Sequence, residues 1–105
     1  MKIAYIISEK ENLVIGDCLS SAKIFYVFDQ SIASYFDLEL PENMEQHQLA
    51  IFLSEFLKQN DIDIVVGTDI GPKAKSALEE RQIQWFIANE TDSIEKINNT
   101  IKNKQ

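Results

Sequence analysis

One stretch decides the fold: Ile62-Asp63-Ile64-Val65-Val66-Gly67-Thr68-Asp69-Ile70-Gly71-Pro72. Its first part is a β-branched apolar run interrupted only by Asp63, which predicts a buried strand over residues 62–67. Pro72 suits the first turn of a helix, where its missing amide N–H is not needed. The apolar residues that follow share one helical face, namely Ala74, Ala77 and Leu78. The stretch therefore predicts a strand, a short loop and a helix.

The segments on either side of this unit complete an α/β pattern. Residues 2–7 form a nearly continuous apolar run, typical of a strand buried on both faces. Two further strands over 22–29 and 32–40 are expected to form a hairpin around the turn-tolerant residues 29–31. The rest predicts a helix over 44–60, a strand over 83–88 and a last helix begun by a capping box of Asp92 and Glu95. A hairpin followed by parallel crossovers predicts a mixed sheet with helices on its faces.

Composition limits the class of protein. The chain has 105 residues, of which 45% are hydrophobic and 26% charged, so we expect one domain over residues 1–105. The net charge of −7, with no basic stripe among the aromatic residues, argues against a nucleic-acid partner. No apolar run approaches the roughly 20 residues that span a bilayer. With a single cysteine, the sequence predicts a cytoplasmic protein that does not contact a membrane.

The loop over residues 68–71 is the first candidate binding site. Ligands of open α/β sheets bind at the carboxyl ends of strands, and a helix N-terminus offers amide N–H groups to anions. Gly71 can adopt backbone angles that other residues avoid, and Lys73 and Lys75 would add positive charge. The Gly-rich run of a P-loop is absent. A site for an anion- or nucleotide-type small ligand and an ordinary strand-to-helix turn both stay open.

Two further candidate metal ligands are Cys18 and His47. The loop position of Cys18 could bring its thiolate to the same end of the sheet as Gly71, and thiolates suit iron-sulfur clusters. A lone cysteine is also commonly a small buried hydrophobic residue. For His47 we expect a place in a solvated first turn, because no second ligand stands at helical spacing from it.

Catalytic constellations are mostly missing. A Ser-His-Asp or Cys-His arrangement would depend on His47 without any local signature. A metal-dependent phosphodiesterase could use Glu9, Asp17 and Asp69, but solvated loop carboxylates are the commoner explanation in a chain this acidic. We therefore expect no enzyme activity.

Three stretches together resemble the dinitrogenase iron-molybdenum cofactor biosynthesis family, which includes the NifX- and NafY-like carriers. They are Lys2-Ile3-Ala4, then Leu19-Ser20-Ser21-Ala22 with Phe25-Tyr26-Val27-Phe28-Asp29, and then the block from Ile62 through Pro72 with Ala74, Ala77, Leu78 and Ile83. The resemblance implies a three-layer α/β/α fold with a mixed sheet of about five strands, similar to ribonuclease H. It also implies a role in binding or carrying an iron-molybdenum or related iron-sulfur cluster, and it does not imply nuclease activity.

The segment around Cys18 departs from the family pattern. Where the family commonly has a His before Phe-Gly, this sequence aligns Cys18, and Ser20 stands in place of the Gly. The resemblance implies a cofactor site formed by Cys18, Ser20 and Ser21 with Gly71 and Pro72 at its rim, and Cys18 as the metal ligand. One thiolate cannot complete the coordination of a cluster. We therefore expect help from exogenous ligands, from a second copy paired through the edge strand over 32–40, or from a metallocofactor assembly or acceptor protein.

Overall fold

The computed structural model describes residues 1–9, 14–16, 24–40, 49–89 and 91–103. The strands are β1 (Lys2–Glu9), β2 (Val14–Ile15), β3 (Ile24–Asp29), β4 (Ser34–Leu38), β5 (Ile64–Gly67) and β6 (Gln84–Ile87). The helices are α1 (Leu49–Gln59), α2 (Pro72–Glu80) and α3 (Ile94–Asn103). The predicted helix over 44–60 thus appears from Leu49, and its first residues lie outside the described part.

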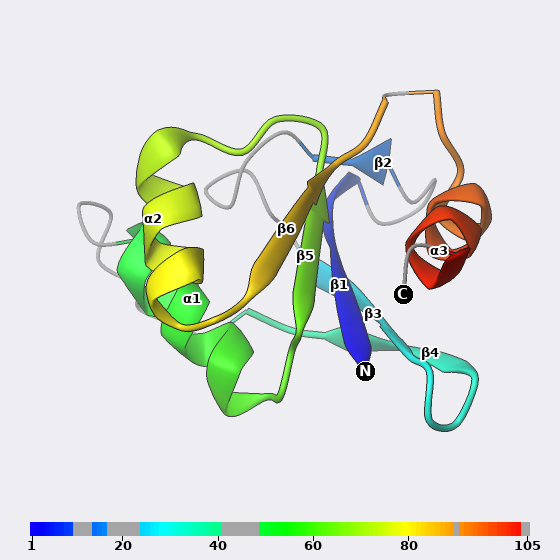
Figure 1. The fold of residues 1–105 in the computed structure, drawn as a ribbon, viewed down its shortest axis with the longest axis horizontal. Coiled ribbons are helices and arrows are strands. Elements are labelled where there is room, and N and C mark those ends of the chain that lie inside the picture. Colours follow the sequence, from blue (N-terminus) through cyan, green and yellow to red (C-terminus); the bar gives the residue numbers. More distant parts are fainter. Residues whose placement is uncertain (10–13, 17–23, 41–48, 90, 104–105) are drawn as a thin grey trace.

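The strands form one mixed sheet in the order β4-β3-β1-β5-β6 (Figure 1). Antiparallel pairs join β1 to β3 and β3 to β4, whereas β1–β5 and β5–β6 are parallel. The short strand β2 pairs with β1 at Ile7 and Glu9, beyond the segment of β1 that pairs with β5. This arrangement is the mixed sheet that the hairpin and the crossovers predict.

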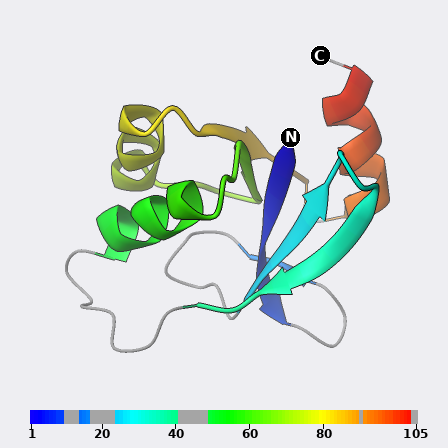
Figure 2. The ribbon, with the colours of Figure 1, turned by 90° about the horizontal axis from the view of Figure 1, so that it is seen from below.

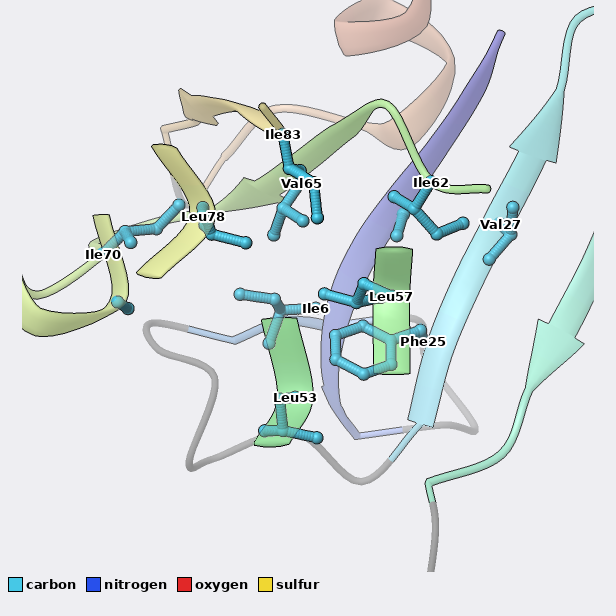
Figure 3. Packing of buried hydrophobic residues seen from close by; sticks show 12 residues of the cluster. Ile6, Phe25, Val27, Leu53, Leu57, Ile62, Val65, Ile70, Leu78 and Ile83 are labelled. Carbon is cyan, nitrogen blue, oxygen red and sulfur yellow. The ribbon is translucent and has the colours of Figure 1, made fainter. Parts of the chain in front are cut away.

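Helices cover both faces of the sheet. The helices α1 and α2 lie together on one face and α3 lies on the other (Figures 1 and 2). Successive residues of β1 divide between them, because side chains alternate along a strand: Ala4 and Ile6 pack toward α1 and α2, and Tyr5 packs toward α3. Figure 3 shows the first of these layers, with Leu53 and Leu57 of α1 against the sheet. The predicted three-layer α/β/α fold is confirmed, while the likeness to ribonuclease H stays a prediction.

The predicted hairpin of β3 and β4 forms, but its turn covers residues 30–33, so Ile32 and Ala33 lie in the turn and not in the predicted second strand. The Asp29 carboxylate accepts hydrogen bonds from the Ser31 amide at 2.9 Å and the Ser31 hydroxyl at 2.6 Å. The hydroxyl bond lowers the pKa of Asp29. The strand β4 is one edge of the sheet, and pairing of two copies through it stays a prediction. No helix in the described ranges is long and apolar enough to cross a bilayer.

The N-cap of α3 lies one residue later than predicted. The Ser93 hydroxyl accepts a hydrogen bond from the Lys96 amide at 3.1 Å, so Ser93 is the N-cap of α3. The Asp92 carboxylate instead accepts from the Lys96 ammonium at 3.0 Å, which lowers its pKa. The capping box of Asp92 and Glu95 is therefore wrong by one position.

The helices α1 and α2 both end in a Schellman motif. In α2, the amide of Gln82 donates to the carbonyl of Glu79 at 3.0 Å and the amide of Ile83 donates to Leu78 at 2.9 Å. In α1, the amides of Asp61 and Ile62 donate the two corresponding hydrogen bonds. In each motif one residue has the left-handed backbone conformation, Asp61 (φ 60°) after α1 and Gln82 (φ 59°) after α2. Glycine is the usual residue at this position. After each motif, an isoleucine lies in the core and packs against a leucine of the preceding helix.

Replacing Gln82 with glycine is expected to stabilise the protein. Left-handed backbone costs a residue with a Cβ about 1–2 kcal/mol, partly offset by the greater freedom of glycine in the unfolded chain. We expect the free energy of unfolding to rise by roughly 0.5–1 kcal/mol in urea titrations. Glu80→Gly is the matched control, since it lies two residues earlier in helical backbone and should destabilise by about 1 kcal/mol. A fall in stability for Gln82→Gly would contradict this account of the helix end.

Candidate functional site

The loop after β5 lies where several chain segments converge. The amide of Thr68 donates to the carbonyl of Gly16 at 3.0 Å, and the amide of Gly16 donates to Ile6 of β1 at 2.7 Å. On the other side, the amide of Ala88 donates to the carbonyl of Gly67 at 2.8 Å. The segments after β2, β5 and β6 are therefore held together at one end of the sheet, which is the position that open α/β sheets use for ligands.

Gly67 has no room for a side chain. A Cβ on this residue would lie 3.0 Å from Ile6 Cδ1, 3.3 Å from the Gly16 carbonyl oxygen and 3.4 Å from Ile70 Cγ1. The contact with Gly16 is made by backbone, which cannot rotate away as a flexible side chain can. Gly67 is thus the glycine that the site requires, although the sequence pattern drew attention to Gly71 instead. The only signal was its place at the end of the strongest strand pattern.

The predicted role of Gly71 is wrong in one respect. Its backbone is extended, with φ −65° and ψ 161°, so it does not use the angles reserved for glycine. A Cβ at this position would meet no atom within 4 Å. Gly71 is instead the N-cap of α2, and Pro72 occupies the first turn as predicted. Because glycine has no side chain to cap the helix, the amides of the first turn stay open to an acceptor from elsewhere.

The two lysines expected beside this turn have different surroundings. Lys73 is exposed in the first turn of α2. The Lys75 ammonium lies over the ring of Trp85 at 4.5 Å from its centroid, and the indole N–H donates to the Glu79 carboxylate at 3.3 Å. Lys73 is therefore the lysine of this pair best placed to meet an anion, while Lys75 is engaged with the neighbouring strand.

A cleft of about 410 Å³ adjoins the start of α2. It runs between α1 and α2 and is lined by Ala50, Ile51, Pro72, Lys73, Ser76, Ala77 and Glu80. The lining offers the Lys73 ammonium and the Ser76 hydroxyl, together with the Glu80 carboxylate at the far end of α2 from the open amides. Its size is within the range of small-molecule pockets.

The structure brings together only part of the predicted site. Gly71 and Pro72 are placed as described, whereas Cys18, Ser20 and Ser21 lie outside the described residues, as does His47. Among the residues that are described, no group of three or more His, Cys, Asp or Glu side chains could hold a metal ion. Of the three carboxylates of the alternative hydrolase site, only the side chain of Asp69 is among those described, and it is exposed.

A model of the family described as dinitrogenase iron-molybdenum cofactor matches residues 1–104 of the chain. The chain belongs to this family. The resemblance found in the three sequence stretches is thereby confirmed. The dinitrogenase iron-molybdenum cofactor family points to cofactor biosynthesis or carriage, by accessory domains that bind or carry a cofactor, and to interaction with dinitrogenase or assembly proteins. No curated protein matches the chain.

Solved structures share the fold at low sequence identity. The apo form of the orange protein from Desulfovibrio gigas has a TM-score of 0.80 at 17% identity, over 99% of this chain and 88% of that one. PH0822 has a TM-score of 0.74 at 16% identity, over 93% and 88%. A Thermotoga protein described as NifB and as a DUF35 family member has a TM-score of 0.73 at 12% identity, over 98% and 89%. At these identities the likeness extends to the fold alone.

Proposed function

We propose that the chain binds an iron-molybdenum or related iron-sulfur cluster non-enzymatically and passes it to an assembly or acceptor protein. The observation that carries this proposal is the match of the family over residues 1–104. The site proposed for the cluster is the end of the sheet where Gly16, Thr68 and the start of α2 meet. Cys18, two residues after Gly16 in the sequence, is the proposed ligand, with Ser20 and Ser21 beside it in the chain.

A site for such a cluster needs local positive charge, because the chain as a whole is acidic. Iron-sulfur clusters with thiolate ligands are anionic, and the chain carries a net charge of −7. The exposed Lys73 and the uncapped first turn of α2 supply local positive potential. With one cysteine and one histidine in the whole chain, the protein cannot complete the coordination of a cluster alone. Incomplete coordination favours transfer over permanent storage.

Removing the Cys18 thiol tests this proposal. Purified protein and Cys18→Ala are titrated anaerobically with iron-sulfur or iron-molybdenum clusters, and visible absorbance is followed. Because loss of a mere supporting contact already weakens metal sites by about 10–100-fold, we expect Cys18→Ala to bind at least about tenfold more weakly. His47→Ala removes the other candidate metal ligand and should leave uptake unchanged. Equal uptake by wild type and Cys18→Ala would remove Cys18 from the mechanism.

A second candidate function is binding of an anion or nucleotide-type small ligand at the Gly71-Pro72 turn. The uncapped first turn of α2, with Lys73 and the adjoining cleft, favours it. Gly71→Asp would place a carboxylate where such an anion sits, while also capping the helix. Phosphate binding that is lost in Gly71→Asp and unchanged in Cys18→Ala would support this function over cluster carriage.

A further inference from the structure

A second cleft lies on the opposite face of the sheet, away from the start of α2. Its volume is about 400 Å³, and it lies between the hairpin of β3 and β4 and the helix α3. Figures 1 and 2 show α3 beside this hairpin, on the side away from α1 and α2. The lining residues include aromatic, amide and charged side chains. They are Phe28, Gln30, Ala33, Tyr35, Glu95, Asn98, Asn99 and Lys102.

Stacked aromatic rings make one wall of this cleft. Tyr35 stands opposite Phe28 in the β3–β4 register, with ring centroids 4.7 Å apart and planes tilted by 44°. The ring of Tyr35 also stacks on Tyr26, with centroids 4.9 Å apart and planes within 11°. Tyr35 is nevertheless 36% exposed, because β4 is an edge strand. The wall is thus held in place by its neighbours and still offers aromatic surface to a ligand.

A buried amide contributes to the lining. Asn98 is 8% exposed, its Oδ1 accepts a hydrogen bond from the Tyr5 hydroxyl, and its Nδ2 donates to the Tyr35 hydroxyl. These bonds use one of the two N–H groups of the amide, and they leave the Tyr35 hydroxyl proton for a further acceptor. Burial raises the pKa of both tyrosines, so both hydroxyls stay protonated at neutral pH. The hydrogen bonds that link Tyr5, Asn98 and Tyr35 therefore hold the donor groups of Asn98 and Tyr35 in fixed positions at the cleft.

The charges that line the cleft balance. Glu95 contributes one carboxylate and Lys102 one ammonium group, while Gln30 and Asn99 contribute uncharged donors and acceptors. In a chain of net charge −7, this lining gives no excess of positive charge to hold an anion. An uncharged ligand with both donor and acceptor groups matches it best.

We propose that this cleft binds an uncharged heteroaromatic compound of nucleoside size, whose ring packs on the aromatic wall and whose edge carries a donor beside an acceptor. Aromatic side chains with nearby amides and carboxylates are the groups that recognise nucleobases. The cleft volume lies within the range of small-molecule sites. This site is separate from the cluster site proposed above and does not depend on it.

The test titrates isotope-labelled protein with adenosine, guanosine and uridine to millimolar concentration and follows side-chain amide and tyrosine NMR signals. At least one nucleoside is expected to shift the signals of Asn98 and Tyr35 with a saturable curve. Tyr35→Leu keeps an apolar residue but removes the ring and the hydroxyl, and we expect it to bind about tenfold more weakly. Asn99→Ala, at an exposed lining position, should weaken binding less without risk to the fold.

The matched control is Ile32→Ser, which changes an exposed apolar residue of the same hairpin that does not line the cleft. Binding should be unchanged in this variant. The proposal is overturned if none of the three nucleosides shifts the Asn98 and Tyr35 signals. It is equally overturned if both Tyr35→Leu and Asn99→Ala bind as wild type does.

Discussion

Replacing Gly67 with valine is expected to lower the free energy of unfolding by about 3 kcal/mol, at the upper end of what overpacking costs. The nearest backbone atom to the added Cβ is the Gly16 carbonyl oxygen, at 3.3 Å. That oxygen also accepts the hydrogen bond from Thr68, so it cannot retreat without breaking the contact between the two loops. Valine has two further methyl groups to place in the same space.

The opposing effect at Gly67 is smaller. Valine favours strands, and glycine inside a strand costs roughly 0.5–1 kcal/mol, so the substitution has a favourable component. Steric overlap should outweigh it, because the three nearest atoms to the added Cβ come from β1 and from the loops after β2 and β5, which pack together. Gly67→Ala should fall between, at about 1–2 kcal/mol, since the Ile6 side chain can shift by a few tenths of an ångström.

Gly71→Ala is the matched control for Gly67. A Cβ there meets open space, and the extended backbone suits any residue, so we expect a change of only a few tenths of a kcal/mol. Urea titrations of the two alanine variants and Gly67→Val measure the difference. If Gly67→Val were as stable as wild type, the close packing of the loops after β2 and β5 would not exist in solution.

Hydrophobic patterns predicted the layers of the fold, because burial on one or both faces leaves a periodic record in the sequence. The strand over 62–67 and the helix at Pro72 are examples. The steric demand on Gly67 left no such record. It arises only in the folded sheet, where the pairing of β2 with β1 places the Gly16 carbonyl next to Gly67, about 50 residues further along the chain.

Helix ends were harder to predict for a different reason. The usual marker of a Schellman motif is glycine, and this chain uses Asp61 and Gln82 in those positions. At α3, Asp92 and Ser93 are both good N-cap residues, and only the hydrogen bond to the Lys96 amide distinguishes them. Local propensity allows both choices, and packing of the apolar face of α3 selects one.

The position of the candidate site in the fold could be predicted from the sequence, whereas the side-chain contacts of the clefts could not. The turn at Gly71 and Pro72 follows from strand and helix signals, and the family match extends over the same block. The network of Tyr5, Asn98 and Tyr35 could not be foreseen, because Asn98 lies on the buried side of a helix whose pattern reads as isoleucines alone. Its partners come from two strands distant in sequence.

Replacing Asn98 with leucine is expected to lower the free energy of unfolding by about 2–3 kcal/mol, because it leaves a buried hydroxyl without its acceptor. Tyr5 is fully buried, and among the residues that the structure describes its other acceptor is the Ile94 carbonyl at 3.5 Å, the limit of a hydrogen bond. The variant also removes the donor to the Tyr35 hydroxyl. Leucine adds apolar contact on the same face of α3, but this gain is smaller than the cost of the unpaired hydroxyl.

A double-mutant cycle of Tyr5→Phe and Asn98→Leu tests whether the two side chains interact. Tyr5→Phe alone should cost about 1 kcal/mol, since it leaves the Asn98 oxygen without a donor. The double variant of Tyr5→Phe with Asn98→Leu should be more stable than Asn98→Leu alone, because replacing both partners with apolar groups removes the unpaired hydroxyl. Asn99→Leu, at the exposed next position of α3, should change stability by less than about 0.5 kcal/mol. Strictly additive losses in the cycle would mean that the Tyr5 hydroxyl and the Asn98 amide do not interact, and α3 would then be held on the sheet by its isoleucines alone.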